Sequence, residues 1–195
     1  MRKGIVVLGI LVVLVLALGG WVRGQYNGLV TEDEAVKAGW AQVENQLQRR
    51  YDLIPNLVET VKGYAAHERE TLEAVTEARA RVGGAGTVDE KIEANEQLSS
   101  ALSRLLVVVE RYPDLKANQN FIRLQDELAG TENRISVERR NYNTLVQSYN
   151  TRVRSFPTNI FAGMFGFERA TIYESAPEAQ TAPRVDFQTG GEGGG

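Results

Sequence analysis

Hydrophobic and polar positions divide the 195-residue chain into distinct regions. Residues 5–22, IVVLGILVVLVLALGGWV, contain no charged side chain, whereas the region that follows is rich in charge and carries apolar residues at helical spacing. Near the C-terminus Pro, Ala, Gln and Gly predominate, and the sequence ends in GGEGGG. The pattern predicts an all-α protein with a short flank (1–4), a transmembrane helix (5–22), an elongated antiparallel helical bundle (23–174) and a disordered Gly-rich tail (175–195).

The apolar N-terminal segment has the length of a membrane span. At ~1.5 Å per residue it covers roughly 27 Å, near the thickness of a bilayer core, and Trp21 stands where an interfacial aromatic belongs. A cleavable signal peptide is the alternative, but its apolar region would be shorter, and ALGG before Trp21 is a weak cleavage pattern. We therefore expect an uncleaved signal anchor. Arg2 and Lys3 precede the span and only Arg23 follows closely, so the positive-inside rule favours an extracytoplasmic bundle by one charge.

The stretch RRYDLIPNLVETVKGY at 49–64 places Pro55 inside a helical pattern. A proline in a helix interior removes one backbone hydrogen bond and costs ~3 kcal/mol. The heptad phase nevertheless continues across it, with only Glu68 departing. The residues in phase are Trp40, Leu47, Ile54, Val61, Val75 and Val82.

We therefore predict one helix of about 51 residues over 32–82, kinked at Pro55. The bundle then has three long helices, or four if the first is broken at Pro55. The kink frees the carbonyl of Tyr51, which water or a polar neighbour such as Asn56 or Arg50 would satisfy.

Two further helices follow a VGGAG loop at 82–86. The stretch TVDE at 87–90 has the form of a capping box and predicts a helix over 88–111. Pro113 can begin a third helix over 113–155 as a first-turn residue. Large apolar residues recur there every seven positions, which is typical of coiled-coil-like packing. They are Phe121, Leu128, Ile135, Tyr142, Tyr149 and Phe156.

Helix lengths predict self-association. At ~1.5 Å per residue the three helices measure ~76, ~36 and ~60 Å, so the second returns only halfway toward the membrane and leaves two apolar stretches without partners. Exposed faces of this kind mark interfaces, with buried aromatics as anchors, which predicts a homo-oligomer centred on Trp40. The alternative is that the chain covers these stretches itself. The predicted interface residues are Val36, Trp40, Val43, Leu47, Tyr149, Val153 and Phe156.

The segment NIFAGMFGF at 159–167 is short, aromatic and interrupted by two glycines. We expect it to fold over one end of the bundle. A contact with the membrane surface is the alternative interpretation.

Composition excludes most chemistry. The chain has no cysteine, which removes disulfides, thiolate metal sites and thiol nucleophiles. Its one histidine, His67, has no second histidine at zinc-protease spacing, and the net charge of -3 argues against nucleic acid as a partner. With no phosphate-binding loop and no nucleophile–base pattern, the sequence predicts a non-enzyme without cofactors or metal.

Several stretches together resemble the LemA family. They are QYNGLV at 25–30, QLQRRYDLIPNLVETVKGYAAHE, RYPDLKANQNFIRLQDEL, ENRISVERRNYNTLVQSYN and FPTNIFA, and the resemblance covers roughly residues 1–175. DLIPNLVETVKGYAAHE is the most specific of them. The resemblance implies a bacterial membrane protein with one N-terminal span and a helical-bundle domain, but no catalytic residues to carry over.

Two functions remain open from the sequence. The first is a non-enzymatic, self-associating scaffold or adaptor at the cell membrane that contacts the lipid bilayer and other membrane proteins. The second is a membrane-tethered module that binds or senses a soluble ligand or a membrane protease partner. Long apolar faces and the lack of a recognisable pocket favour the scaffold.

Overall fold

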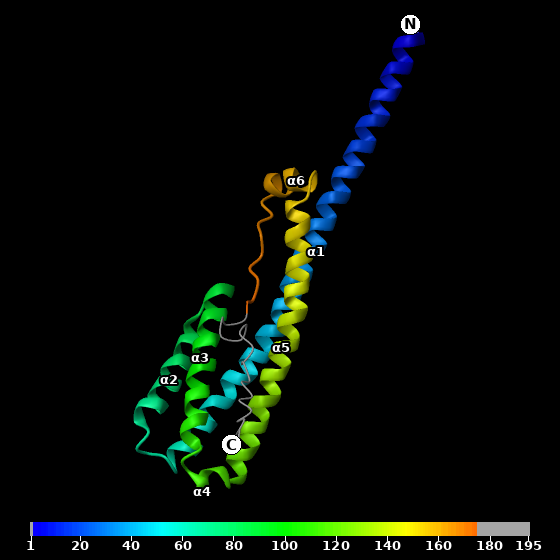
Figure 1. Ribbon diagram of the computed structural model, residues 1–195. Coiled ribbons are helices and arrows are strands. Elements are labelled where there is room, and N and C mark those ends of the chain that lie inside the picture. The colour runs from blue at the N-terminus through cyan, green and yellow to red at the C-terminus, as the bar shows by residue number, and fades with distance from the viewer. Residues whose placement is uncertain (1, 175–195) are drawn as a thin grey trace, which may run out of the picture.

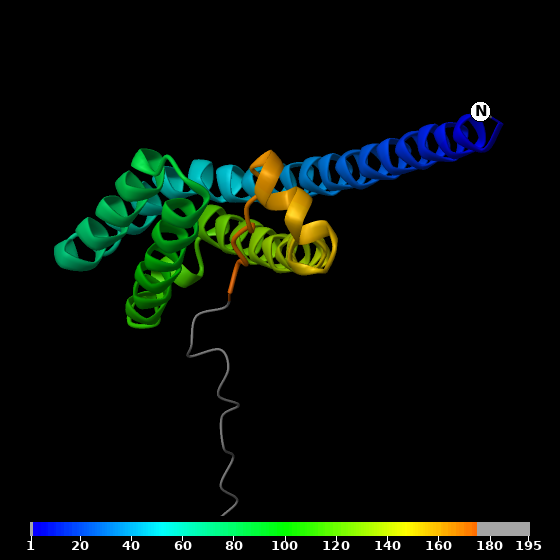
Figure 2. The ribbon, with the colours of Figure 1, turned by 90° about the horizontal axis from the view of Figure 1, so that it is seen from above.

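One very long helix organises the molecule. In the computed structural model, which describes the backbone of residues 2–174 and the side chains of residues 4–174, α1 (Arg2–Lys62) runs without a break from the apolar N-terminal segment into the bundle. Helix α5 (Gln119–Arg154) packs along its bundle portion (Figures 1 and 2). The described part of the chain contains six α-helices and no strand, which confirms the predicted all-α architecture.

The remaining helices flank this pair at its two ends. The antiparallel hairpin of α2 (Arg69–Gly84) and α3 (Val88–Val109) lies beside the end of α1 that is distant from the N-terminus (Figure 1). Short α4 (Pro113–Lys116) connects the hairpin to α5, and α6 (Thr158–Phe165) lies at the other end of α5, against α1 (Figure 2).

The first helix of the bundle passes through Pro55 as predicted, but it does not reach residue 82. It ends at Lys62, and a turn over 63–68 reverses the chain into α2. Gly63 weakens the helix there, and the amides of Tyr64 and Ala65 both donate to the carbonyl of Val61, at 3.0 and 2.8 Å. The prediction of a single 51-residue helix is therefore wrong. The apolar phase persists across the turn because α1 and α2 face the same core.

The other predicted boundaries are partly correct. The capping box at Thr87 is confirmed, since its hydroxyl accepts from the amide of Glu90 at 3.2 Å and the Glu90 carboxylate accepts from the amide of Thr87 at 3.0 Å. The backbone amides of Thr87 and Gly86 both donate to the Glu90 carboxylate, and these two bonds lower the pKa of Glu90 below its ordinary value. The predicted third helix over 113–155 is instead two helices, α4 and α5. The division occurs because the side chain of Asn118 caps α5 by accepting hydrogen bonds from the amides of Asn120 and Phe121.

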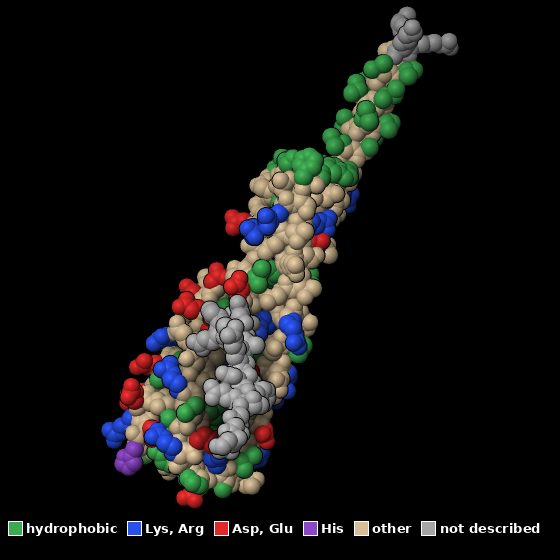
Figure 3. Space-filling view, viewed as in Figure 1, with side chains coloured by type: hydrophobic (Ala, Val, Ile, Leu, Met, Phe, Trp, Pro, Cys, Tyr) green, Lys and Arg blue, Asp and Glu red, His purple; other side chains and the backbone are tan. Residues whose placement is uncertain are grey.

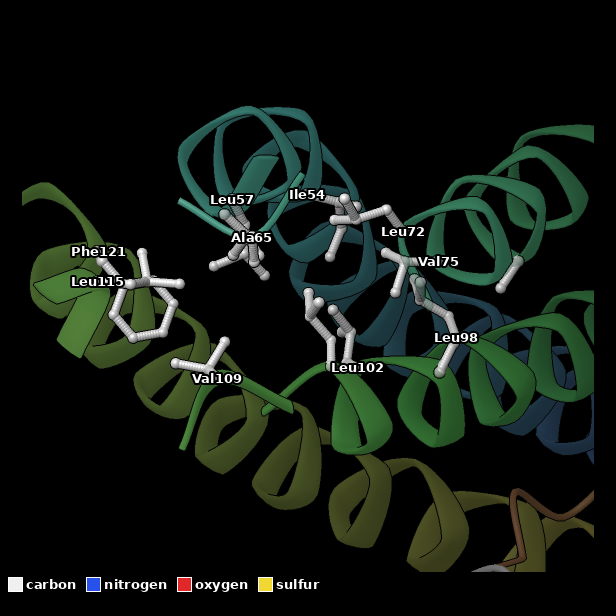
Figure 4. Close-up of a cluster of buried hydrophobic side chains, with 14 residues drawn as sticks. Ile54, Leu57, Ala65, Leu72, Val75, Leu98, Leu102, Val109, Leu115 and Phe121 are labelled. Carbon is white, nitrogen blue, oxygen red and sulfur yellow. The ribbon is translucent and has the colours of Figure 1, made fainter. Parts of the chain in front are cut away.

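Two apolar clusters hold the bundle together. One joins the C-terminal end of α1 to the α2–α3 hairpin and the start of α5, with Ile54, Val75 and Leu105 among its buried members (Figure 4). The other lies between α5 and the part of α1 nearer the apolar segment, residues 29–47, with Val43 and Tyr149 fully or almost fully buried. The predicted disordered tail, residues 175–195, lies outside the described residues.

Candidate functional site

An apolar surface surrounds the point where α1 leaves the bundle. Helix α6 covers this end, and its aromatic residues pack edge-to-face on α1: Phe161 on Trp21 at a ring distance of 5.4 Å, and Phe165 on Tyr26 at 5.0 Å. Figure 3 shows hydrophobic side chains gathered at this end. We call this surface the collar, which comprises Trp21, Tyr26, Phe156, Ile160, Phe161, Met164 and Phe165.

The collar is fastened to the bundle on its inner side, although its outer face is open. Ala162 is buried against the bundle, and the hydroxyl of Thr158 donates to the side-chain oxygen of Gln25 on α1 at 3.2 Å. Gly166 ends α6 in the left-handed conformation (φ 75°) that glycine adopts without strain. Facing outward, Phe156 is 81% exposed and Met164 is 70% exposed.

After α6 the chain turns back along the bundle as an extended segment, residues 167–174, which we call the strap (Figure 1). Two asparagines on α5, seven positions apart, hold its backbone. Asn150 donates to the carbonyl of Ala170 and accepts from its amide, both at 2.8 Å. Asn143 does the same to Tyr173, at 2.8 and 2.9 Å. Each asparagine thus replaces the partner strand that an extended backbone would otherwise require.

The strap covers the apolar cluster that lies between α1 and α5. Tyr173 is buried against Trp40 at a ring distance of 6.4 Å, and burial raises the pKa of its hydroxyl. Between the strap and α3 lies a groove of about 650 Å³, whose walls carry Asp89, Glu93 and Glu96 from α3 and Arg169 from the strap. One wall of the groove therefore presents carboxylates, and the other wall is the strap, whose backbone Asn143 and Asn150 hold in place.

A buried arginine ties three helices together below the strap. Arg50 on α1 is 4% exposed, and its guanidinium donates to Ser99 on α3 at 2.7 Å and to Glu132 on α5 at 3.0 Å. Burial lowers the pKa of Arg50, which the charge of Glu132 opposes. The group remains a cation, since an arginine guanidinium is effectively always protonated in proteins.

The carbonyl that Pro55 frees has a specific partner. The Nε of Arg79 on α2 donates to the Tyr51 carbonyl oxygen at 3.2 Å, and the same guanidinium lies 3.9 Å from the centroid of the Tyr51 ring. The expectation that Asn56 or Arg50 would satisfy this carbonyl was wrong. Pro55 instead leaves an acceptor that fixes α2 against α1.

Sequence comparisons assign the chain to a known family. A profile of the LemA family matches residues 39–187, most of the chain. The chain belongs to the LemA family. It is 27% identical to Protein LemA of Metamycoplasma hominis, over 85% of this chain and 74% of that protein. It is 26% identical to Magnetosome protein MamQ 2 of Paramagnetospirillum magneticum and to Magnetosome protein MamQ of Magnetospirillum gryphiswaldense, in each case over 80% of this chain and 67% of the relative.

The comparisons and the described residues also bear on chemistry and on membrane anchoring. None of the names of these relatives states an enzymatic activity. In the part of the chain that the structure describes, no group of three His, Cys, Asp or Glu side chains could hold a metal ion. Residues 4–62 contain a window apolar enough to cross a membrane, with none of it buried in the bundle.

The predicted self-association interface assumed that its apolar residues have no partners within one chain. This assumption is wrong for most of them. Six of the seven lie in the core of a single chain, because the α1–α5 pair and the strap cover them. Phe156 is the exception and belongs to the collar. The six buried residues are Val36, Trp40, Val43, Leu47, Tyr149 and Val153. Self-association itself stays a prediction, without this surface to support it.

Sequence reasoning missed the strap and its two asparagines. A signal was present, since Asn143 and Asn150 repeat at the seven-residue spacing of the apolar face and each follows a tyrosine of that face, Tyr142 or Tyr149. A polar repeat in phase with a core predicts side chains at the edge of that core, where they can hold another segment.

We predict that Arg79 and Pro55 are energetically coupled. Arg79→Ala should lower the free energy of unfolding by ~1–3 kcal/mol, because it removes the hydrogen bond to the Tyr51 carbonyl and the contact with the Tyr51 ring. Pro55→Ala should raise the stability or leave it unchanged, since the new amide can donate to that carbonyl. Arg79→Ala should then cost less in the Pro55→Ala background.

A double-mutant cycle measured by chemical denaturation of the full-length protein in detergent tests this coupling. Arg104→Ala, at an exposed position of α3, is the matched control and should change the stability by less than about 0.5 kcal/mol. Additive effects of Arg79→Ala and Pro55→Ala would contradict the assignment. A large loss from Pro55→Ala alone would show that the packing requires the proline.

Proposed function

We propose that this LemA-family chain is a single-pass, non-enzymatic scaffold or adaptor of the cell membrane, whose bundle is held at a fixed position relative to the bilayer. The observation that carries the proposal is the continuity of α1, which passes from the apolar segment into the bundle core without a loop. A bundle joined to its anchor by a helix cannot turn freely, so any surface it presents has a defined height and direction. A fixed geometry is useful for holding other membrane proteins.

Anchoring also supports contacts between neighbouring copies. Confinement to one membrane raises the effective concentration, so a weak contact suffices for assembly. We further propose that the bundle lies outside the cytoplasm, on the one-charge excess of Arg2 and Lys3 over Arg23.

Crosslinking in intact membranes tests the scaffold proposal. Photo-reactive residues at exposed positions of α2 and α3 should give discrete protein adducts, either with a second copy or with a defined partner. Inserting six glycines after Arg23 should weaken or abolish these adducts. Inserting seven helix-forming residues nearly preserves the helical phase but raises the bundle by ~10.5 Å. Adducts with a second copy, which is raised equally, should then persist, whereas adducts with another membrane protein should move to other positions or be lost. Absence of any protein adduct in the parent chain would overturn the proposal, as would adducts that are indifferent to the glycine insertion.

A second candidate function is that of a binding module for an extended polypeptide, and the asparagine grip favours it. Asn143 and Asn150 bond only to backbone atoms of the strap, so another extended segment could take its place. This function requires the strap to open while the bundle stays folded.

Amide hydrogen exchange on the full-length protein distinguishes a permanent strap from an exchangeable one. The amides of Ala170 and Tyr173 should exchange through a local opening that costs clearly less free energy than global unfolding. If these two amides exchange only when the buried amides of α5 do, that is, through global unfolding, the binding module is excluded.

We predict that Asn143→Ala loosens the strap. Loss of two hydrogen bonds at a partly buried site should cost ~1–3 kcal/mol and speed the exchange of the Tyr173 amide more than that of the α5 amides. Asn141→Ala is the matched control on the same helix, because the exposed side chain of Asn141 donates a hydrogen bond to Glu138 of its own helix and none to the strap. Equal exchange rates in the two variants would contradict the role of Asn143.

A further inference from the structure

We infer that the collar is a bilayer-docking surface: the outer face of α6 and the preceding Phe156 insert among lipid headgroups beside the emerging span. The inference rests on the membrane anchor of the proposed function and adds a second, independent membrane contact. It names the occupant of an apolar surface that the bundle itself leaves open.

The chemistry of α6 suits an interface rather than water. Its sequence, TNIFAGMF, contains no charged residue, and Ile160 and Met164 point away from the buried Ala162. Phe156 adds a third large apolar side chain in the open. A free surface of this kind at the end of a soluble bundle would have no compensating contact.

The position of α6 along α1 fixes its depth. Phe161 packs on Trp21, which is at the end of the uncharged segment 5–22, and Phe165 packs on Tyr26, about 7.5 Å further along the helix. Tryptophan and tyrosine concentrate at the boundary between hydrocarbon and headgroups. The collar is thus continuous with the span and lies at the level of that boundary.

Charges around the collar fit the same placement. Arg23, on α1, and Arg154, two residues before Phe156, are exposed and flank the apolar face, where their guanidinium groups can reach lipid phosphates. Apolar residues bordered by arginines are typical of helices that lie in the plane of a membrane surface. The bilayer fits this surface better than a second copy of the chain does, because the collar is continuous with the exposed apolar span.

Site-specific fluorescence tests the inference, because the chain has no native cysteine. Full-length Met164→Cys, labelled with an environment-sensitive dye, is reconstituted into phosphatidylcholine–phosphatidylglycerol vesicles that contain lipids brominated near the headgroup. We expect a blue-shifted emission and a loss of intensity. The matched control is Val107→Cys at the far end of α3, where the native side chain is 72% exposed, close to the 70% of Met164. Its label should show aqueous emission and no quenching.

Further labels separate the outcomes. Leu14→Cys, in the span, should be quenched by lipids brominated deep in the acyl chains; if it is not, the anchor itself fails. If Leu14→Cys is quenched while labels at both Met164 and Ile160 show aqueous emission, only the docking inference is overturned. Blue-shifted emission at Met164 without quenching by brominated lipid would also overturn it, because the collar would then be covered by protein.

Discussion

Trp40→Ala should lower the free energy of unfolding by ~3–5 kcal/mol without changing the mass of the particle in solution. Trp40 is 9% exposed, and its indole packs edge-on against Tyr142, with ring centroids 5.4 Å apart. It also lies at a tilt against Tyr173 of the strap, with ring centroids 6.4 Å apart. Truncation removes both contacts and leaves a cavity between α1 and α5. The side chain is fully engaged within one chain, so its loss should not disturb contacts between chains.

Chemical denaturation and light scattering of the full-length protein in detergent provide the two measurements. Val107→Ala is the control and should change neither quantity appreciably, because the side chain is exposed. A fall in mass at unchanged stability would restore Trp40 as an interface residue. A small loss of stability with unchanged mass would show that the cavity collapses or that the strap compensates.

The heptad pattern predicted the buried face of α5 because periodicity reports which side of a helix avoids water. Ile135, Tyr142 and Tyr149 are buried as that pattern requires. Phe156 continues the spacing but lies beyond the end of α5, where the backbone leaves the helix and the side chain turns outward. The seven-residue spacing alone does not show where the helix ends.

The turn over 63–68 was hidden from the pattern for a related reason. Ala65 is buried in the turn, and Val75 resumes the apolar phase on α2, so the sequence reads as one helix although the chain reverses. The strap was not foreseeable in position, since its partners Asn143 and Asn150 lie 20–30 residues away. Local propensity contains no information about such contacts.

Arg50 shows the same limit in a charged side chain. Its neighbours in sequence, Arg49 and Tyr51, give no sign that one of two adjacent arginines is buried. Burial follows from Ser99 and Glu132, which approach from α3 and α5, 49 and 82 residues further along the chain. The environment that determines its role exists only in the folded bundle.

Arg50→Glu should therefore be among the most damaging single changes, at about 4 kcal/mol or more. The substitution places a carboxylate at a site with 4% exposure, facing Glu132 instead of pairing with it. Burial and the like charge would raise the folded-state pKa of the introduced carboxyl above its unfolded value. The destabilisation should thus be complete above that folded pKa and should shrink as the pH falls through it.

Arg50→Met separates the cost of a wrong charge from the loss of the arginine itself. The methionine fills a similar volume, Ser99 keeps its bond to the Asn95 carbonyl at 2.9 Å, and Glu132, whose side chain is 59% exposed, returns to water. We expect a change within ~1.5 kcal/mol, because well-packed apolar replacements of buried ion pairs are often neutral. Denaturation at pH 7 and pH 4 measures both variants against the parent chain. A pH-independent loss from Arg50→Glu, equal to that from Arg50→Met, would contradict this account, because it would show that the charge at position 50 has no effect on stability.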